Sequence, residues 1–243
     1  MADLAVIKYI IKETKNVWRF IFEAPMYDKL DYKPGQLVNL FLKSPMDPMP
    51  HVRSYSIASY PDDSNTFELI ITDQPGGKMS DWLFRNASEG AEIGYKGPMG
   101  IFTLPETIDR DLYFVCTGSG ISPFRSMVNH IFRNNIETKN INLVFGCRTK
   151  KDLLYYDELK DLAEKHDKFN FYACLSREDE YGFHNGYVHD VYLPMIEEYP
   201  LHKQDNKPLF YLCGWRDMID EARMHLGERD YKMKKDIKVE IFG

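Results

Sequence analysis

The spacing of apolar segments changes near residue 105, and this change most strongly limits the folds open to the chain. Before it, short β-rich segments alternate with turns such as Lys33-Pro34-Gly35 and Pro75-Gly76-Gly77, a pattern typical of an antiparallel barrel or sandwich. After it, apolar runs alternate with segments of helical composition such as 122–134 and 156–166, which indicates a parallel sheet covered on both faces. The sequence therefore predicts two domains, an antiparallel β-barrel over residues 1–104 and an α/β parallel-sheet domain over residues 105–243.

Charge and residue usage exclude several classes of function. Lys and Arg total 31 against 37 Asp and Glu, for a formal net charge of -6. No basic stripe offsets this background, so we expect no nucleic-acid partner. Charged residues interrupt every hydrophobic run before it reaches membrane-spanning length, which predicts a cytoplasmic protein without membrane insertion. The 4 cysteines are irregularly spaced and the 7 histidines scattered, so we expect no disulfide framework, no fused iron–sulfur cluster and no metal site.

A glycine-containing loop follows the first apolar run of the second half. It reads Thr117-Gly118-Ser119-Gly120 and leads into a helical segment. Gly118 and Gly120 allow a tight turn and a close approach to a pyrophosphate, whose charge the amino end of a helix favours. The third glycine of the usual dinucleotide fingerprint is missing, and a tight strand-to-helix turn would use the same glycines. From these residues alone, nucleotide binding and a simple turn are both open.

The first half carries one polar stretch inside an otherwise apolar strand, Arg53-Ser54-Tyr55-Ser56. The period of a strand places Arg53 and Tyr55 on one face and Ser54 and Ser56 on the other. The guanidinium is suited to a phosphate and the tyrosine ring to stacking on a flat ring system. The alternative is a half-buried strand with a solvated arginine and a core tyrosine.

A second glycine turn, at Gly76-Gly77, precedes Lys78-Met79-Ser80 and a short helical segment. The N–H groups from Gly77 to Ser80 are suited to a pyrophosphate, and the Ser80 side chain is also able to cap the helix. A plain loop between a hairpin and a helix is the alternative.

Four apolar runs of the second half end in or next to a cysteine, at Cys116, Cys147, Cys174 and Cys213. Ligands of open α/β sheets bind outside the carboxyl ends of the strands, so we expect these positions to border one crevice. Cysteine is also a small hydrophobe that fits a crowded strand end, and this is the alternative interpretation.

Taken together and in order, these segments resemble the plant-type branch of the ferredoxin–NADP⁺ reductase superfamily. The resemblance rests on R-x-Y-S-[IL]-A-S at 53–59, G-x-x-S at 77–80, G-P-x-G at 97–100 and T-G-x-G-[IL]-[AS]-P-F-R-S at 117–126. It continues through L-x-x-G-x-x-T-x-x-x-L-L-Y at 143–155, S-R-E at 176–178, C-G at 213–214 and the terminal V-E-x-[YF] at 239–242. It implies an FAD-binding barrel followed by a Rossmann-like NAD(P)-binding domain.

The resemblance also implies residue roles. Arg53 would bind the FAD pyrophosphate, Tyr55 would pack on the isoalloxazine, and Ser56 would lie near flavin N5. Gly77, Lys78, Met79 and Ser80 would hold the pyrophosphate from the other side. Thr117 would sit between the flavin and nicotinamide sites, and Cys213 and Glu240 would lie beside the nicotinamide. Phe242 would cover the flavin face until the nicotinamide displaces it. Ser56, Cys213 and Glu240 are the candidate catalytic residues. The cofactor sites would also include Ser54, Gly118, Gly120, Cys147, Arg148, Ser176, Arg177, Gly214 and Trp215.

The implied activity is hydride transfer between NADP(H) and FAD, and single-electron transfer between FAD and a separate ferredoxin or flavodoxin. Ser176 and Arg177 favour NADP(H) over NAD(H), because a hydroxyl and a guanidinium bind a 2′-phosphate. Three acids follow at 178–180 and would repel a phosphate if they face it. Two alternatives remain: an NAD(P)H-dependent reductase for an oxygenase, a free flavin or another small acceptor, and a non-catalytic electron-transfer or interaction subunit.

Overall fold

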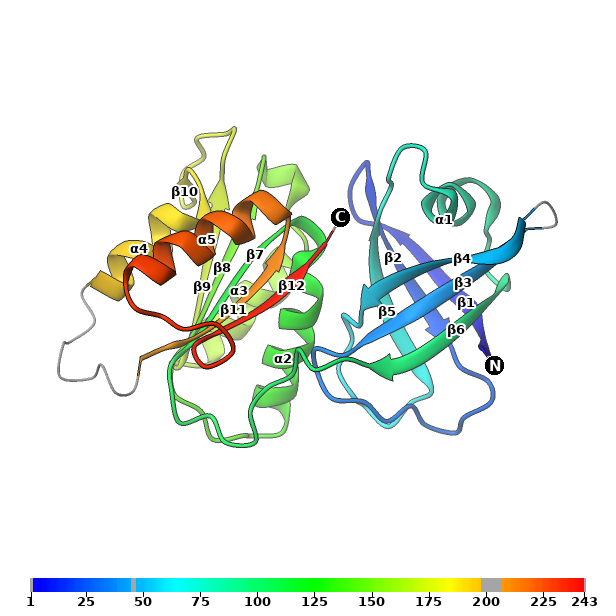
Figure 1. Ribbon diagram of the computed structural model, residues 1–243, viewed down its shortest axis with the longest axis horizontal. Helices are drawn as coiled ribbons and strands as arrows, with labels where there is room; N and C mark the ends of the chain where they lie inside the picture. Colours follow the sequence, from blue (N-terminus) through cyan, green and yellow to red (C-terminus); the bar gives the residue numbers. More distant parts are fainter. Residues whose placement is uncertain (1, 45–46, 198–206, 243) are drawn as a thin grey trace. The chain divides into compact units, whose positions relative to one another are not determined.

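The computed structural model describes residues 2–44, 47–197 and 207–242 (Figure 1). Contacts divide the chain into two compact units. The first contains the chain through Leu104 together with Ser122–His130, and the second contains Pro105–Ile121 and the chain from Ile131 onward. The first three quarters of the helix Ser122–Arg133 therefore pack with the N-terminal unit, although the loop before this helix belongs to the second unit.

The first unit is built on six strands that pair only antiparallel. They are β1 (Asp3–Lys12), β2 (Val17–Glu23), β3 (Leu37–Ser44), β4 (Asp47–Ser56), β5 (Thr66–Thr72) and β6 (Glu92–Met99). Their order is β4-β3-β6-β1-β2-β5. An antiparallel bridge between Ile57, directly after β4, and Leu69 of β5 joins the two ends of this order. The sheet is therefore closed into the predicted antiparallel barrel.

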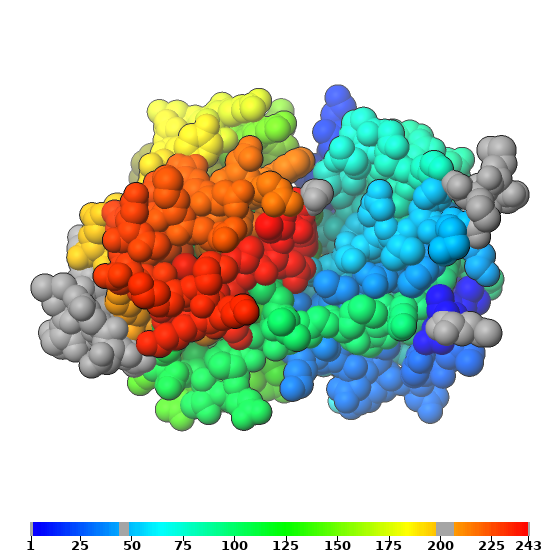
Figure 2. All heavy atoms as spheres, viewed as in Figure 1, coloured from blue at the N-terminus to red at the C-terminus, as the bar shows by residue number. Residues whose placement is uncertain are grey.

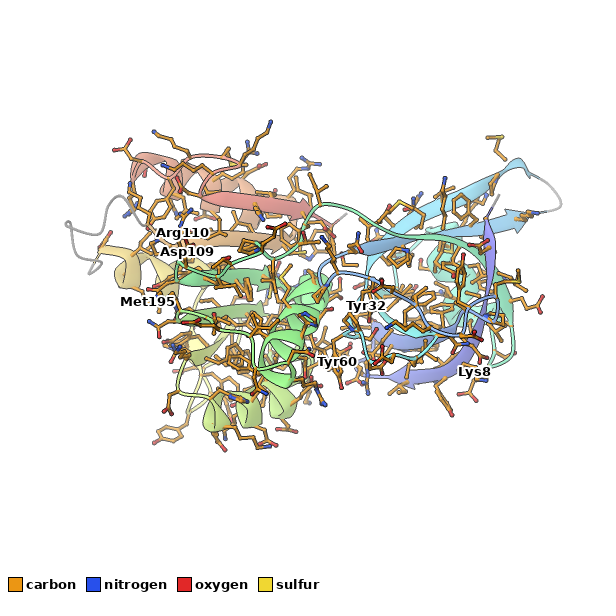
Figure 3. All side chains as sticks on the ribbon, turned by 90° about the horizontal axis from the view of Figure 1, so that it is seen from below. Lys8, Tyr32, Tyr60, Asp109, Arg110 and Met195 are labelled. Atoms are coloured by element: carbon orange, nitrogen blue, oxygen red, sulfur yellow. The ribbon has the colours of Figure 1, made fainter. Side chains whose placement is uncertain are left out.

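Alternation of apolar residues along the strands fills the barrel interior. Phe20 and Phe22 of β2 and Phe67 of β5 are fully buried, and the Phe22 and Phe67 rings stack with centroids 5.2 Å apart. Tyr32, labelled in Figure 3, lies in the loop before β3 and shares a 2.9 Å hydrogen bond with the Ser59 hydroxyl. Such buried aromatic pairs are stabilising beyond the area they bury, so the interior forms a rigid support for the strand ends.

A short helical segment interrupts the barrel between β5 and β6. It consists of α1 (Lys78–Asp81) and a π-helical turn, η1 (Trp82–Asn86). Met79 and Leu83 are buried in the barrel core, and α1 packs against β4. The glycine turn before α1 is thereby anchored beside the strand that carries Arg53 and Tyr55.

The second unit is built on six strands that pair only in parallel. They are β7 (Leu112–Thr117), β8 (Ile141–Cys147), β9 (Phe169–Leu175), β10 (His184–Asn185), β11 (Leu209–Gly214) and β12 (Ile237–Ile241). Their order is β10-β9-β8-β7-β11-β12. The predicted parallel sheet is confirmed, and its central strands are buried along nearly their whole length.

Helices connect the parallel strands. They are α2 (Ser122–Arg133), α3 (Tyr156–Lys165), α4 (Val188–Glu197) and α5 (Arg216–Glu228), with short 3-10 turns η2 (Gly118–Ile121) and η3 (Lys150–Asp152). Apolar residues of α4 and α5 share one core with the sheet, whereas α3 packs on β9. Figure 2 shows α5 and the C-terminal segment side by side on the near surface of this unit. No helix in the described ranges is long and apolar enough to span a membrane.

Candidate functional site

The strand β4 presents the predicted polar stretch in the expected alternation. Tyr55 pairs with Val38, and Arg53 pairs with Leu40. The Tyr55 ring packs partly against the barrel core, and this burial raises its pKa to about 12. Arg53 is exposed and donates one hydrogen bond, of 2.8 Å, to the Val52 carbonyl. No carboxylate among the described residues pairs with Arg53, so its planar donors face solvent and are suited to an anion.

The glycine turn at 76–77 brings main-chain N–H groups to the same region. Gly76 has a φ of +77°, which favours glycine, and the helix that follows packs against β4. Ser80 is buried and its hydroxyl donates to the carbonyls of Gln74 (2.9 Å) and Gly77 (3.0 Å). A cap by Ser80 is therefore not formed, because the side chain bonds backward to carbonyls and leaves the first-turn N–H groups uncapped by it.

These residues fit an FAD pyrophosphate. An exposed guanidinium on β4 and the first-turn N–H groups of the adjacent helix belong to one unit and are complementary to a diphosphate. The Met79 side chain points into the barrel core, so only its main chain is available for such binding. Ser54 donates its hydroxyl to the Asn39 side chain at 2.6 Å, and Ser56 is buried. The roles of these residues remain predictions.

In the second unit, the loop after β7 lies directly against the end of β11. A Cβ atom added at Gly120 would lie 2.4 Å from the Cys213 carbonyl oxygen, and one added at Gly214 would lie 2.4 Å from Thr117 Oγ1. The Trp215 N–H donates to the same Thr117 hydroxyl at 3.3 Å. Gly120 and Gly214 are therefore required by close main-chain packing. Gly118 differs, because its φ of +54° is the left-handed conformation and its Cβ position is open.

Several sequence-predicted residues meet at this edge of the sheet. Cys213 pairs in parallel register with Cys116 on one side and with Glu240 on the other. The Phe242 N–H donates to the Gly214 carbonyl at 2.9 Å, which holds the C-terminal segment beside β11. Cys213 is fully buried, and burial, followed by the charge of Glu240, raises the pKa of its thiol well above the ordinary value. A thiol in this setting stays neutral and is a poor nucleophile.

The ends of β8 and β9 are joined by main-chain hydrogen bonds. The Ser176 N–H donates to the Cys147 carbonyl at 3.0 Å, and the Arg177 N–H donates to the Arg148 carbonyl at 2.9 Å. Both arginine side chains are exposed. Burial raises the pKa of the Cys147 thiol, which donates to the Asp152 carbonyl at 3.3 Å. This geometry brings together the main chains of Cys147, Arg148, Ser176 and Arg177.

Lys150 is a residue of this edge that the sequence reasoning missed. Its N–H donates to the Glu178 carboxylate at 2.7 Å, and its ammonium donates to the Glu180 carboxylate at 2.8 Å. Two of the three acids at 178–180, which would repel a phosphate if they faced it, are therefore hydrogen-bonded to Lys150. The two consecutive lysines at 150 and 151, which follow β8 closely, could have indicated this cationic position from the sequence.

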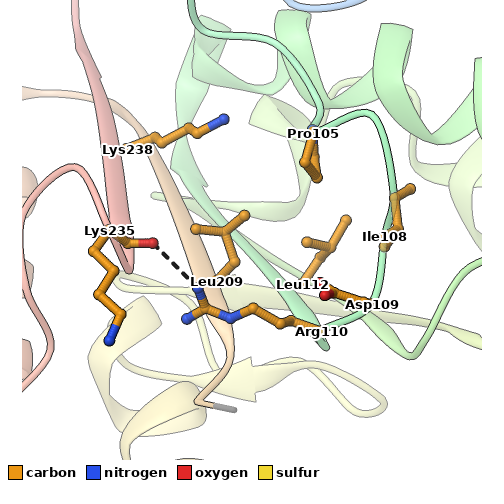
Figure 4. Close-up of a pocket in the computed structure, with 8 residues that line it drawn as sticks. All are labelled: Pro105, Ile108, Asp109, Arg110, Leu112, Leu209, Lys235 and Lys238. Carbon is orange, nitrogen blue, oxygen red and sulfur yellow. Dashed lines mark hydrogen bonds between the residues drawn. The ribbon is translucent and has the colours of Figure 1, made fainter. Parts of the chain in front are cut away.

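A cavity of about 350 Å³ lies at the opposite, amino-terminal edge of the same sheet (Figure 4). Leu112 and Leu209 contribute to its lining, and none of the sequence-predicted site residues does. The Arg110 guanidinium in its wall donates to Asp236 at 2.7 Å and to the carbonyls of Pro208 and Lys235. Its donors are thus used within the fold. In the parts of the chain that the structure describes, no three His, Cys, Asp or Glu side chains gather as metal ligands.

Two family models match the two halves of the chain. An oxidoreductase FAD-binding domain matches residues 5–104, and an oxidoreductase NAD-binding domain matches residues 114–224. The barrel with its β4–α1 region therefore lies in the FAD-binding match, and the loop 117–120 with β11 lies in the NAD-binding match.

Curated relatives cover most of the chain. The chain is 34% identical over 193 residues to ferredoxin--NADP reductase B of Sorangium cellulosum, spanning 79% of this chain and 78% of that protein. It is 30% identical over 239 residues to the glycine betaine monooxygenase reductase subunit of Pseudomonas aeruginosa, spanning 96% of this chain. The match covers 62% of that reductase subunit, so the relative is considerably longer than the aligned region.

Solved structures share the fold over the whole length. The cytochrome P450 reductase GcoB of Amycolatopsis superposes with a TM-score of 0.85 at 23% identity, covering 100% of this chain and 71% of that one. A ferredoxin NADP⁺ reductase from Neisseria gonorrhoeae, with bound FAD and NADP, superposes with a TM-score of 0.82 at 24% identity, covering 98% and 97%. At these identities the likeness establishes the fold.

Proposed function

Because the chain belongs to the ferredoxin–NADP⁺ reductase superfamily, we propose that it is an FAD-dependent oxidoreductase that exchanges electrons between NADP(H) and a separate ferredoxin or flavodoxin. When bound, FAD supplies the conversion between two-electron exchange with the nicotinamide and one-electron exchange with the carrier. The protein would act in the cytoplasm.

The observation that carries this proposal is the packing of the Thr117–Gly120 loop on Cys213-Gly214. Main-chain contacts as short as those at Gly120 and Gly214 leave no room for side chains. This packing fixes the loop, and Gly118, with a φ of +54° and open space at its Cβ position, leaves bare main chain before the amino end of α2. Bare main chain at a helix amino end allows a pyrophosphate to approach closely.

The residues of the barrel would bind and orient the flavin. Arg53 and the first turn of α1 would hold the pyrophosphate, and the partly buried Tyr55 ring would stack on the isoalloxazine. Ser56 would lie near flavin N5. Tyr55 suits stacking because the barrel core supports one side of its ring, so little side-chain entropy is lost on binding.

The residues at the carboxyl edge of the parallel sheet would hold the nicotinamide nucleotide. Thr117, Cys213 and Glu240 would contact the nicotinamide, with the neutral thiol of Cys213 providing an apolar wall and Glu240 a polar one. Phe242 would cover the flavin in the absence of nucleotide. These residues exclude water and orient the reacting carbon, which is the main contribution a protein makes to such a transfer.

We propose NADP(H) as the preferred nucleotide. The support is that the Lys150 ammonium pairs with Glu180 and the Lys150 N–H donates to Glu178, so that one of the acids after Ser176 and Arg177 is offset by a lysine. The third acid of this run, Asp179, is exposed. An exposed guanidinium next to a hydroxyl, with a lysine pairing one nearby acid, favours a phosphate dianion over a ribose hydroxyl.

Anaerobic stopped-flow absorbance tests the proposal. The purified protein should be yellow, and NADPH should bleach its flavin band rapidly and at lower concentration than NADH. The reduced protein should then transfer electrons to ferredoxin or flavodoxin. Equal rates with NADH at low concentration would contradict the nucleotide preference, and a protein that cannot be loaded with FAD would support an interaction subunit instead.

A second candidate function is a reductase component that supplies an oxygenase. Its support is the similarity to the glycine betaine monooxygenase reductase subunit and to the propane 2-monooxygenase reductase component of Mycolicibacterium goodii, which is 32% identical over 200 residues. Steady-state assays with different acceptors distinguish the two. Rapid turnover with an oxygenase component or free flavin, and none with ferredoxin or flavodoxin, would favour this second candidate.

A further inference from the structure

We infer that Glu68 and Arg125 are positioning residues for the proposed flavin reduction, because they hold the amino-terminal half of α2 to the segment that follows β4. This inference rests on the proposed function. It concerns a buried ion-pair network inside the first unit, formed by Arg19, Glu68 and Arg125, which we term the Glu68 clasp.

Glu68 is an acid in the middle of an apolar strand. It lies on β5 and is 7% exposed. Its two carboxylate oxygens face different arginines: Oε2 lies 3.6 Å from Arg19 of β2, and Oε1 lies 3.4 Å from Arg125 of α2. A buried carboxylate is retained only when such partners compensate its desolvation, and removing one partner is costly. A hydrophobic side chain at this position would stabilise the barrel core more than a carboxylate does. The role of the acid therefore lies in the residues that it binds.

Arg125 connects two segments that the proposed chemistry needs. Its guanidinium donates to the Ala58 carbonyl at 3.0 Å in addition to contacting Glu68. Ala58 comes two residues after Ser56, and Arg125 comes five residues after Gly120. The bond therefore joins the segment after the flavin strand to the helix that begins directly after the nucleotide loop.

The main chain around Glu68 is held to the same segment. The Glu68 N–H donates to the Ser59 hydroxyl at 3.0 Å, and the Glu68 carbonyl accepts from the Ala58 N–H at 2.8 Å. The clasp thus joins β5 and residues 58–59 on one side to α2 on the other. Breaking it should release the helix without disturbing the barrel strands.

Other contacts keep α2 on the barrel when the clasp is broken. The rings of Phe102 and Phe124 lie 5.9 Å apart, and a Cβ atom at Gly35 would lie 2.4 Å from the Met127 methyl group. These apolar contacts are non-directional, whereas the clasp fixes Arg125 through two acceptors. Loss of the clasp should therefore displace the helix by less than the length of one residue and leave the unit folded. Misplacement by about 1 Å lowers the rate of an oriented reaction by up to a factor of about 100.

The test compares flavin reduction in Glu68→Gln, Arg125→Gln and the double variant, with Glu23→Gln as the matched control. Glu23 is a partly exposed acid of the same barrel that pairs with Lys8 at 3.0 Å. We expect the reduction rate per bound flavin at saturating NADPH to fall about tenfold or more in each single variant. The double variant should lose no more than the larger single effect, because both changes break one link. The control should stay within twofold of wild type.

Three readouts separate positioning from folding. Affinity for 2′,5′-ADP, which occupies only the adenosine end of the nucleotide site, should not change. Electron transfer to ferricyanide from dithionite-reduced protein should not change either, because it bypasses the nucleotide. Wild-type rates per bound flavin in both single variants would overturn the inference, even if flavin content fell. Wild-type protein that neither NADPH nor NADH reduces would instead contradict the proposed function itself.

Discussion

The contact between Gly120 and the end of β11 yields the sharpest prediction from the structure. In Gly120→Ala, the added methyl carbon would lie 2.4 Å from the Cys213 oxygen, 2.7 Å from its carbonyl carbon and 3.0 Å from Gly214 Cα. Ordinary contact begins at 3.4 Å, so the loop and the strand must separate by about 1 Å at the closest pair. All three neighbours are main-chain atoms, and no side chain is available to rotate away.

The strand cannot yield, because β11 is paired with β7 on one side and with β12 on the other. The displacement therefore falls on the loop Gly118–Ile121. Forcing extra volume into a packed site costs about 1–3 kcal/mol, and occasionally more. Because this site is buried and entirely main chain, we expect a loss of about 3 kcal/mol in the free energy of unfolding. The shifted loop should also lower the rate of flavin reduction by up to about 100-fold.

Two other glycines provide matched controls for this substitution. Gly118→Ala places a methyl group in open space, so only backbone strain at the φ of +54° of residue 118 matters. This strain should lower the free energy of unfolding by about 1–2 kcal/mol. Gly227→Ala lies within α5, again with open space around the Cβ position, and should stabilise by about 0.5–1 kcal/mol. Urea unfolding followed by far-UV circular dichroism measures all three. The reasoning is refuted if Gly120→Ala is as stable as Gly118→Ala.

Three further predictions concern individual side chains. Because burial raises the pKa of the Cys213 thiol above 9.0, the unfolded chain loses this proton first. The contribution of Cys213 to the free energy of unfolding is therefore constant below pH 9. Above pH 9 the free energy of unfolding should fall by about 1.4 kcal/mol per pH unit. Urea titrations of Cys213→Ala should show a decline that is shallower by that amount. Arg177→Gln should raise the Kd for NADPH about tenfold, with NADH unchanged as the control, since a charge-assisted bond to the 2′-phosphate is lost; equal effects on both nucleotides in steady-state assays would contradict this role. Phe242→Ala should tighten NADP⁺ binding about 2- to 10-fold in equilibrium titrations, the range that loss of one competing aromatic contact allows, and weaker binding would show that the ring does not compete.

Local pattern was sufficient to predict the features that depend on neighbouring residues. The alternation of Arg53 and Tyr55 follows from the period of a strand, and the apolar runs of the second half follow from burial on both faces of a parallel sheet. The proximity of Cys213 and Glu240, which pair in adjacent parallel strands, was expected only from the family resemblance. The roles of these residues remain predictions.

Features set by distant residues could not be predicted. Gly120 looked like a turn residue, whereas its constraint comes from Cys213, which is far away in the sequence. The Ser80 hydroxyl had two local choices, a first-turn N–H or a carbonyl, and sequence pattern does not rank them. Glu68 is a charged residue within an apolar strand that the sequence analysis did not single out, and its arginine partners lie on elements whose packing only the fold reveals.

In the proposed function, the residues that would form the nucleotide site differ from those that would select the nucleotide. Gly120 and Gly214 act through close packing between the end of β11 and the segment formed by Thr117 and η2, so substitutions there should change stability and binding together. Arg177 and Lys150 are exposed and lie at the ends of β8 and β9, where their neighbours are main-chain carbonyls and the acids Glu178 and Glu180. Exposed charges contribute little to folding. Substitutions at Arg177 and Lys150 should therefore change the nucleotide preference without loss of the fold. Substitutions at Gly120 and Gly214 should not achieve this.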